Sequence, residues 1–298
     1  MLKIIVILGP TASGKSQLAI KLARKFNGEI ISADSRQVYK GLDIGTEKIS
    51  KKEMKGIEHH MLGVANPKKV YTVVQYQKTA KKIIFKILKK RKIPIIVGGS
   101  GFYIDTLIDD YQLPKVSAQP ELRKQLDKKS TEELFKQLKK IDPRRAKTID
   151  RYNKRRLIRA LEIILTTKKP MEILRRAQDK KSKYDFLKIG IKKSPKKLRQ
   201  LINQRLKKTL KRGLPKEVEK LRRRGLSWQR LEELGMEYRL VSHYLRGLIS
   251  RPQMISQMQR EIYRYAKRQM TWFKRDKNIK WVKNYQEAET LAKNFLLC

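Results

Sequence analysis

The first candidate for chemistry is a short segment near the start of the chain, Gly9-Pro10-Thr11-Ala12-Ser13-Gly14-Lys15-Ser16. It matches the pattern G-x-x-x-x-G-K-[ST] and lies between an apolar run at 2–8 and a helical pattern, the context that this motif requires. Its glycines let backbone N–H groups turn inward around phosphate oxygens, Lys15 adds a positive charge, and Ser16 can bind Mg²⁺. The segment predicts a phosphate-binding loop (the P-loop, residues 9–16) but does not say which phosphate compound it holds.

Asp34 lies just past a second predicted strand at 29–32. Ligands of an open α/β sheet bind at this edge, so a carboxylate here could orient an approaching amine or hydroxyl, or accept its proton. The alternative is that Asp34 or Ser35 caps a helix that follows. Spacing alone leaves both interpretations open.

A glycine-rich turn, residues 98–101, ends another predicted strand at 93–97. Glycine permits a ligand to approach the backbone closely, and Ser100 offers a hydroxyl. A plain strand-to-helix turn explains the same residues equally well.

The adjacent histidines His59 and His60 would point in different directions on a strand or on a helix. They are therefore poorly placed to chelate one metal ion, and we expect them to pack or to form hydrogen bonds.

Hydrophobic periodicity indicates the elements that must position these residues. Strands alternate with helices as far as residue 111, and this alternation predicts a parallel sheet covered on both faces. From 114 to about 183 we find only helical signals, among them a capping box formed by Ser130 and Glu133. The expected fold is an α/β, P-loop NTPase-like parallel-sheet core, residues 1–111 and 187–298, with a helical insertion at 112–186.

The individual elements follow from the same patterns. We predict helices at 72–90, 155–166, 195–212, 215–224 and 253–275, and further strands at 187–191 and 279–282.

The charge balance points to a polyanionic partner. The chain has 74 Lys and Arg residues against 28 Asp and Glu, a net charge of +46. Such an excess favours RNA or DNA, because every neutralised phosphate releases a counterion. A lysine-rich proteome is the alternative explanation.

Basic and aromatic residues interleave along the predicted helix at 259–275. Single-stranded RNA is bound by phosphate contacts combined with stacking surfaces, which this run could supply. An amphipathic helix with its aromatic residues packed inward is the alternative.

Cysteine usage and hydropathy limit the class of protein. The one cysteine, Cys298, excludes a disulfide framework and a cysteine-rich zinc site, which fits a reducing cytoplasm. No stretch approaches the roughly 18 apolar residues of a membrane span. We expect a cytoplasmic protein, without a membrane partner and monomeric by default.

These motifs together resemble the tRNA dimethylallyltransferase family, also called tRNA isopentenyltransferases, over nearly the whole chain. The likeness rests on the P-loop and on the segment 34–46, Asp-Ser-Arg-Gln-Val-Tyr-Lys-Gly-Leu-Asp-Ile-Gly-Thr. Further matching segments lie at 98–100, 117–123, 156–162, 203–205 and 266–273. The chain departs from the family at 234–239, where Leu-Gly-Met-Glu-Tyr-Arg is two residues longer than the usual Leu-Gly-Tyr-Lys/Arg.

The resemblance implies a reaction and a set of site residues. The family transfers a dimethylallyl group from dimethylallyl diphosphate to N6 of the adenine next to the anticodon, in tRNAs reading codons that start with U. By that likeness Asp34 would be the general base, and Ser16 with Mg²⁺ and Arg205 would bind the diphosphate together with the P-loop, which is also a nucleotide-binding motif. Residues implied to contact the tRNA anticodon stem-loop are Asp34, Ser35, Arg36, Gln37, Ser100, Arg123, Arg155, Arg156, Leu157, Ile158 and Arg159.

Two other classes share the P-loop. A small-molecule or nucleoside kinase would use it for ATP, but this reading leaves the charge of +46 unexplained. A P-loop NTPase that binds RNA without modifying it would want an acidic residue after an apolar strand, and the strand at 93–97 ends in Gly98-Gly99 instead.

Overall fold

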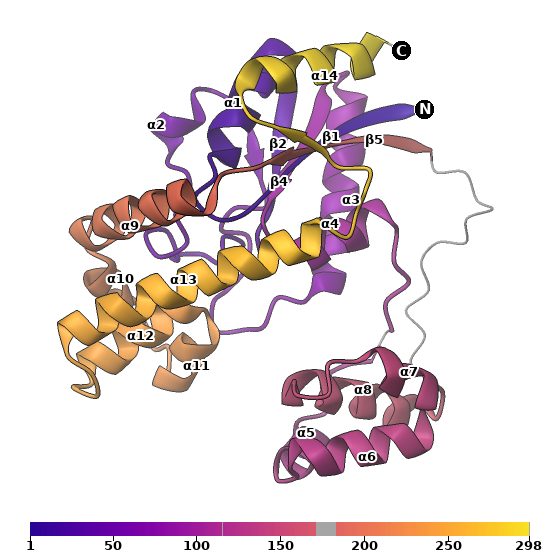
Figure 1. The fold of residues 1–298 in the computed structure, drawn as a ribbon, viewed down its shortest axis with the longest axis vertical. Coiled ribbons are helices and arrows are strands. Elements are labelled where there is room, and N and C mark those ends of the chain that lie inside the picture. The colour runs from indigo at the N-terminus through magenta and orange to yellow at the C-terminus, as the bar shows by residue number, and fades with distance from the viewer. Residues whose placement is uncertain (115, 171–182, 298) are drawn as a thin grey trace. The chain divides into compact units, whose positions relative to one another are not determined.

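The computed structural model describes residues 1–114, 116–170 and 183–297 (Figure 1). The chain divides into two compact units, Met1–Ile108 with Lys181–Cys298, and Asp109–Lys180. Each unit has a hydrophobic core of its own. Within the described residues, no helix is both long and apolar enough to cross a membrane.

A parallel sheet forms the centre of the first unit. Its strands run in the order β3-β2-β4-β1-β5-β6. They are β1 (Leu2–Leu8), β2 (Gly28–Ala33), β3 (His59–His60), β4 (Ile93–Gly98), β5 (Tyr184–Ile191) and β6 (Lys280–Val282). The predicted α/β fold with a parallel sheet is therefore confirmed.

The structure corrects two details of the expected strands. β5 begins at Tyr184, earlier than residue 187, because it pairs with β1 along the whole of that strand, from Leu2↔Tyr184 to Leu8↔Gly190. β3 was not predicted; it consists of two residues that pair with Ile30 and Ile31 of β2. Such a short strand leaves no periodic pattern in the sequence.

Alternating residues of β1 face two different cores, as the pleat of a strand requires. Ile5 and Ile7 pack with α1 (Lys15–Lys25) and α14 (Tyr285–Leu297). Ile4, Val6 and Leu8 face the larger core, which includes α3 (Val73–Lys89) and α4 (Gly101–Ile108). The sheet is thus covered on both faces, which explains why its strands read as continuous apolar runs.

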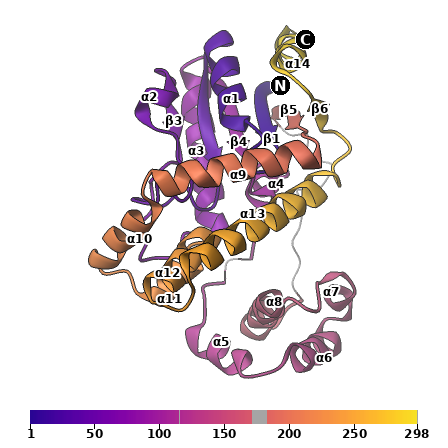
Figure 2. The same ribbon diagram turned by 60° about the vertical axis from the view of Figure 1, so that its left-hand side comes forward.

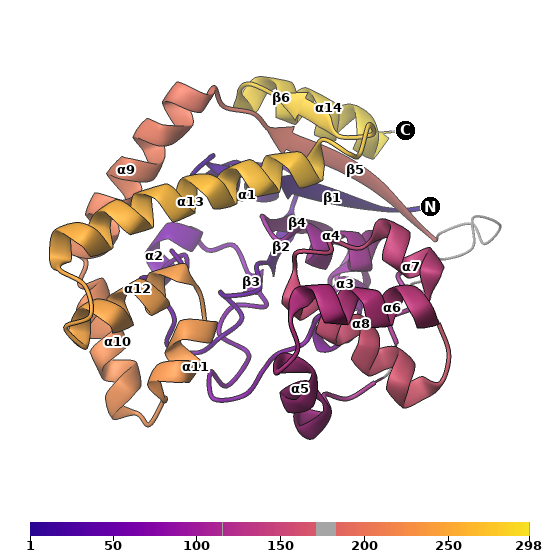
Figure 3. The same ribbon diagram turned by 60° about the horizontal axis from the view of Figure 1, so that its bottom comes forward.

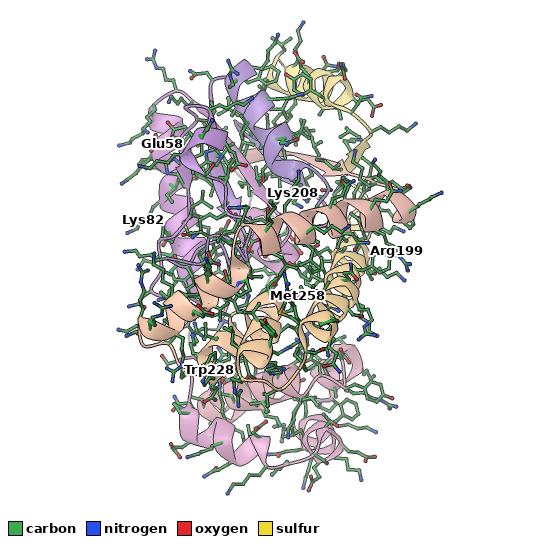
Figure 4. The ribbon with its side chains drawn as sticks, turned by 90° about the vertical axis from the view of Figure 1, so that its left-hand side faces the viewer. Glu58, Lys82, Arg199, Lys208, Trp228 and Met258 are labelled. Atoms are coloured by element: carbon green, nitrogen blue, oxygen red, sulfur yellow. The ribbon has the colours of Figure 1, made fainter. Side chains whose placement is uncertain are left out.

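Between β5 and β6 the chain of this unit is helical (Figure 2). The helices are α9 (Pro195–Lys211), α10 (Leu214–Arg223), α11 (Trp228–Glu233), α12 (Met236–Leu245) and α13 (Arg251–Phe273). α9 and α13 pack on each other, and the guanidinium of Arg199 on α9 lies 4.3 Å from the ring centroid of Tyr263 on α13. Figure 4 labels Arg199 on α9 and the buried Met258 on α13.

One stripe of α13 is buried, while basic side chains on its other faces are exposed. The buried residues recur every three to four positions: Met254, Met258, Ile262, Ala266, Gln269 and Phe273. The buried stripe therefore packs α13, the helix in which basic and aromatic residues interleave, against the rest of the unit. Arg264, Lys267 and Arg268 are exposed and remain accessible to a polyanion.

The second unit is a small group of helices (Figure 3). They are α5 (Pro120–Asp127), α6 (Thr131–Ile141), α7 (Pro143–Thr148) and α8 (Lys154–Thr167). Leu134, Leu138, Leu157 and Leu161 are fully buried in its core. The predicted capping box is confirmed, because Ser130 accepts the N–H of Glu133 at 3.1 Å and Glu133 accepts the N–H of Ser130 at 2.7 Å.

Candidate active site

Four loops of the first unit meet at the carboxyl edge of the sheet. The strand registers align Leu8 with Gly98 and Gly190, and Ala33 with Gly98, so the residues that follow these strands are neighbours. A Cβ built on Gly9 would lie 2.9 Å from the carbonyl oxygen of Ile191, where Gly9 has a φ of 146°. The P-loop, Asp34 and Ser100 therefore lie on the edge where parallel sheets bind ligands.

The P-loop has the backbone geometry of an anion cradle. Gly14, with a φ of 94°, is the N-cap of α1, which begins at Lys15 and directs its N–H groups and partial positive charge toward the loop. The hydroxyl of Ser13 is buried and has no hydrogen-bond partner among the described residues. Ser16 is exposed in the first turn of the helix.

Lys15 brings a titratable cation to this cradle. Its ammonium group donates a hydrogen bond to the carbonyl oxygen of Pro10 at 2.6 Å. Burial lowers the pKa of Lys15 to about 7; the positive charge of Arg205 also lowers it, and the negative charge of Asp34 opposes them. Arg205 and Asp34 therefore both lie within electrostatic reach of Lys15.

Asp34 holds a turn that follows β2. Its Oδ1 accepts the backbone N–H of Arg36 at 2.8 Å and that of Gln37 at 3.3 Å. The helix-cap alternative for Asp34 and Ser35 is wrong, because a turn and not a helix follows these residues. Both bonds use Oδ1, and in the described part of the chain no donor is bonded to Oδ2, so this half-buried carboxylate keeps an oxygen for a ligand.

The neighbours of Asp34 connect two loops of the site. The N–H of Ser35 donates to the hydroxyl of Ser100 at 3.1 Å, so the turn after β2 is tied to the turn after β4. The amide of Gln37 is bonded within its own segment, since it accepts from Ser32 and donates to the carbonyl oxygen of Thr46, both at 3.0 Å. Gln37 therefore shapes the loop that carries Asp34.

Arg205 and Glu237 reach this site from helices distant in the sequence. Arg205 is half-buried on α9, and Glu237 is half-buried in the first turn of α12. Burial raises the pKa of Glu237; the charge of Asp34 raises it further, while Arg205 and Arg36 oppose this. Glu237 falls in the segment 234–239 that departs from the family pattern, and periodicity alone gave no indication of its position.

A tyrosine of α13 faces the same group. Burial raises the pKa of Tyr265, as do the charges of Asp34 and Glu237, while a hydrogen bond with Ser100 and the charge of Arg36 lower it. The sequence run at 259–275 included Tyr265 as an aromatic residue, but nothing in that run indicated that its hydroxyl would lie beside Ser100.

The second unit contains the remaining predicted site residues, and two of them form its internal ion pair. The guanidinium of Arg123 donates to both carboxylate oxygens of the fully buried Glu162, at 2.7 and 2.8 Å. Arg159 donates to Glu162 at 2.5 Å and to the carbonyl oxygen of Val116 at 2.9 Å. Burial would raise the pKa of Glu162, but the bonds from Arg123, Gln119 and Arg159 outweigh it and lower the pKa to about 2.

Of the other four predicted tRNA contacts in this unit, two are buried and two are exposed. Leu157 is fully buried and Ile158 is 8% exposed, so their side chains pack in the core of the unit and do not offer a contact surface for RNA. Arg155 and Arg156 are exposed in the first turn of α8.

His60 takes part in an ionic network at the far edge strand. Its Nε2 lies 2.9 Å from Oε2 of the buried Glu29, which also accepts from Lys90 and Lys92. Burial would raise the pKa of Glu29, but these three partners lower it to about 2. Glu29, Glu58 and His60 could enclose a metal ion, but two lysines already neutralise Glu29. The expected hydrogen-bonding function of His60 is confirmed.

These features define a P-loop α/β protein whose phosphate cradle shares one edge of the sheet with a carboxylate, Asp34, in the turn after β2. The family model described as IPP transferase matches residues 37–276. A tRNA dimethylallyltransferase of Acetivibrio thermocellus is 40% identical over 98% of this chain and 95% of its own length. One of Anoxybacillus flavithermus is 41% identical over 94% and 89%.

Solved structures agree with the sequence comparisons. The full-length tRNA isopentenylpyrophosphate transferase from Bacillus halodurans superimposes with a TM-score of 0.73 at 34% identity, covering 100% of this chain and 96% of that one. A eukaryotic dimethylallyltransferase acting on tRNA gives a TM-score of 0.77 at 28% identity, with 100% and 78% covered. The chain belongs to the IPP transferase family of tRNA dimethylallyltransferases.

Proposed function

We propose that this protein transfers the dimethylallyl group of dimethylallyl diphosphate to N6 of an adenine beside the anticodon of tRNA. The observation that carries the proposal is the meeting of the P-loop, Asp34 and Arg205 at one edge of the sheet, in a chain of this family. In the reaction the bond between the allylic carbon and the diphosphate oxygen breaks, a bond from N6 to that carbon forms, and N6 loses a proton. We place the protein in the cytoplasm, where it would meet its tRNA substrates directly.

The leaving diphosphate gains negative charge as its bond to carbon breaks. Donors that bind it most strongly at that moment lower the barrier, and each is worth about 2.7–4 kcal/mol. The P-loop N–H groups, the Ser13 hydroxyl, Lys15 and Arg205 are the candidates, since all lie in or beside the cradle. Ser16 fits a site for Mg²⁺, because this ion is held by one or two protein oxygens together with phosphate oxygens and water.

Asp34 is the proposed acceptor of the N6 proton. Its Oδ1 is fixed by two backbone N–H groups, which orient the carboxylate, and no donor among the residues described is bonded to its Oδ2. A base held in this way costs little to orient in the transition state.

We further propose that exposed cations bind the anticodon stem-loop. Arg155 and Arg156 of the second unit are exposed, as are Lys267 and Arg268 on α13. Arg123 and Arg159 would act indirectly, by holding α8 in place through Glu162.

The test is to incubate the protein with labelled dimethylallyl diphosphate, Mg²⁺ and bulk tRNA. We expect label in the RNA, and at least about a hundredfold slower labelling with the Asp34→Asn variant. ATP turnover without labelling of RNA would instead support the kinase alternative and overturn the proposal.

A further inference from the structure

We propose that Gln269 of α13 is a positioning residue that holds the P-loop in register with the turn at 98–101. It would thereby hold the diphosphate half of the active site against the half that carries Asp34. This inference rests on the proposed function and assigns a part in it to a residue that touches neither substrate.

The amide of Gln269 connects two loops. Its Oε1 accepts the backbone N–H of Thr11 in the P-loop at 2.8 Å, and its Nε2 donates to the carbonyl oxygen of Gly99 at 2.8 Å. The side chain is 6% exposed. An N–H can only donate and a carbonyl can only accept, so these partners fix the orientation of the amide. Movement of either loop would break one of these two hydrogen bonds, of which the bond to Gly99 is buried and the bond from Thr11 is partly buried.

The glycines of the turn make room for α13. A Cβ at Gly99 would lie 2.2 Å from Nε2 of Gln269, and a Cβ at Gly101 would lie 2.3 Å from Cδ1 of Trp272. Neither side chain could then occupy its observed place. The sequence left open whether these glycines admit a ligand or only make a strand-to-helix turn, and the structure shows the close approach of a helix at Gly99 and Gly101.

Trp272 holds α13 in place beside the two loops that the Gln269 amide connects, and we call this connection the Gln269 bridge. It lies three residues beyond Gln269, and its Nε1 donates to Oδ2 of Asp105 on α4 at 2.8 Å. α13 is therefore attached both to Gly99 within the turn and to α4 beyond it, and these contacts hold the Gln269 amide in place beside the P-loop.

The bridge continues to the proposed base. Gly99 precedes Ser100, whose hydroxyl accepts the N–H of Ser35, and Ser35 follows Asp34 directly. One chain of contacts thus joins Thr11 of the P-loop to the Asp34 turn through Gln269. Since the amine and the departing diphosphate act on opposite sides of one carbon, their separation must be kept within a fraction of an ångström.

The test compares Gln269→Leu, which removes both bonds at similar volume, with Gln257→Leu, at a half-buried glutamine of the same helix. We expect Gln269→Leu to lower kcat at least about tenfold and to weaken binding of inorganic diphosphate about tenfold by calorimetry. KM for tRNA should stay within about twofold, and the Gln257→Leu protein should match the wild type. Unchanged kcat and diphosphate affinity in a folded Gln269→Leu protein would overturn the proposal.

A second variant keeps the inference testable if Gln269→Leu does not fold. In Gln269→Glu the neutral carboxyl can accept from Thr11 and donate to Gly99, whereas the carboxylate cannot donate. Burial beside a carbonyl oxygen raises the pKa of such a carboxyl, so kcat of the variant relative to wild type should rise as the pH falls from about 8 to 6. A flat ratio would contradict positioning by these bonds. Diphosphate binding requires no transfer, so it tests Gln269 even if the wild type modified no RNA.

Discussion

The hydroxyl of Tyr238 donates a hydrogen bond of 2.8 Å to Oε1 of Glu217, and this buried pair holds the loop that follows the Asp34 turn. Glu217 also accepts the backbone N–H groups of Asp43, Ile44 and Gly45, at 2.9, 2.6 and 3.0 Å. A Cβ on Gly45 would lie 2.7 Å from the Tyr238 ring. The backbone of Asp43, Ile44 and Gly45 is therefore held by the Glu217–Tyr238 pair.

Replacing this carboxylate should destabilise the first unit. Glu217→Ala would leave three backbone N–H groups and the Tyr238 hydroxyl without their buried acceptor, and we expect a loss of about 3–5 kcal/mol in the free energy of unfolding. Denaturant unfolding measures it. The matched control is Glu219→Ala on the same helix, whose ion pair with Arg223 is exposed and should contribute less than about 1 kcal/mol. Equal losses in the two variants would contradict this assignment.

Glu162→Gln should weaken the second unit in a pH-dependent way. At neutral pH the change removes a buried charge shared by Arg123 and Arg159, and we expect a loss of about 3 kcal/mol. The folded-state pKa of about 2 lies below the ordinary 4.5, so the carboxylate stabilises the fold above pH 4.5 and loses this effect as the pH falls toward 2.

Hydrogen exchange of amides in α5–α8 reports the stability of this unit alone. The difference between wild type and Glu162→Gln should shrink as the pH is lowered from about 5 to 3. Glu132→Gln, at an exposed position of α6, is the control and should show no such difference. A gap that stays constant with pH would mean that Glu162 acts through packing and not through its charge.

Binding of dimethylallyl diphosphate should weaken as the pH rises above 7. Lys15 has a pKa of about 7 in the free protein, against an ordinary value of 10.5. A bound diphosphate favours the charged ammonium and raises this pKa, so binding takes up a proton between these values. The dissociation constant should increase from about pH 7.5 to 9.5, with proton uptake seen by calorimetry in two buffers. Lys15→Met should bind weakly at every pH; a wild-type affinity independent of pH would exclude this coupling.

Asp34→Asn should stop transfer while leaving the site assembled. Asparagine keeps the oxygen that accepts from Arg36 and Gln37, so the turn survives, but it cannot take the N6 proton. We expect kcat to fall about 10²–10⁴-fold with KM for tRNA within about twofold. Asp43→Asn, at an exposed carboxylate paired with Lys48, is the control. An equal loss of tRNA binding and of rate in Asp34→Asn would reassign Asp34 as structural.

Local patterns predicted most of the fold. The apolar run of β1, the P-loop and the capping box of Ser130 are each decided by neighbouring residues, and the structure has them where we expected. β3 and the start of β5 depend on pairing with distant strands, which no local pattern reveals.

The site residues also divide into those that local sequence marks and those that depend on the packing of distant elements. The P-loop and Asp34 are readable because strand ends and glycines mark them. Glu237, Tyr265 and Gln269 come from helices whose periodicity indicates only a buried face. Whether a polar residue on such a face meets Ser100 or Thr11 depends on how helices distant in the sequence pack on the sheet edge.

The bridge between Thr11 and Gln269 has a consequence for synthesis of the protein. These residues are 258 positions apart, so at about 5–20 residues per second the ribosome adds Gln269 roughly 10–50 s after Thr11. During that interval the nascent P-loop lacks its anchor. A chain that ends before α13 would carry the phosphate-binding motif without the bond from Thr11 to Gln269.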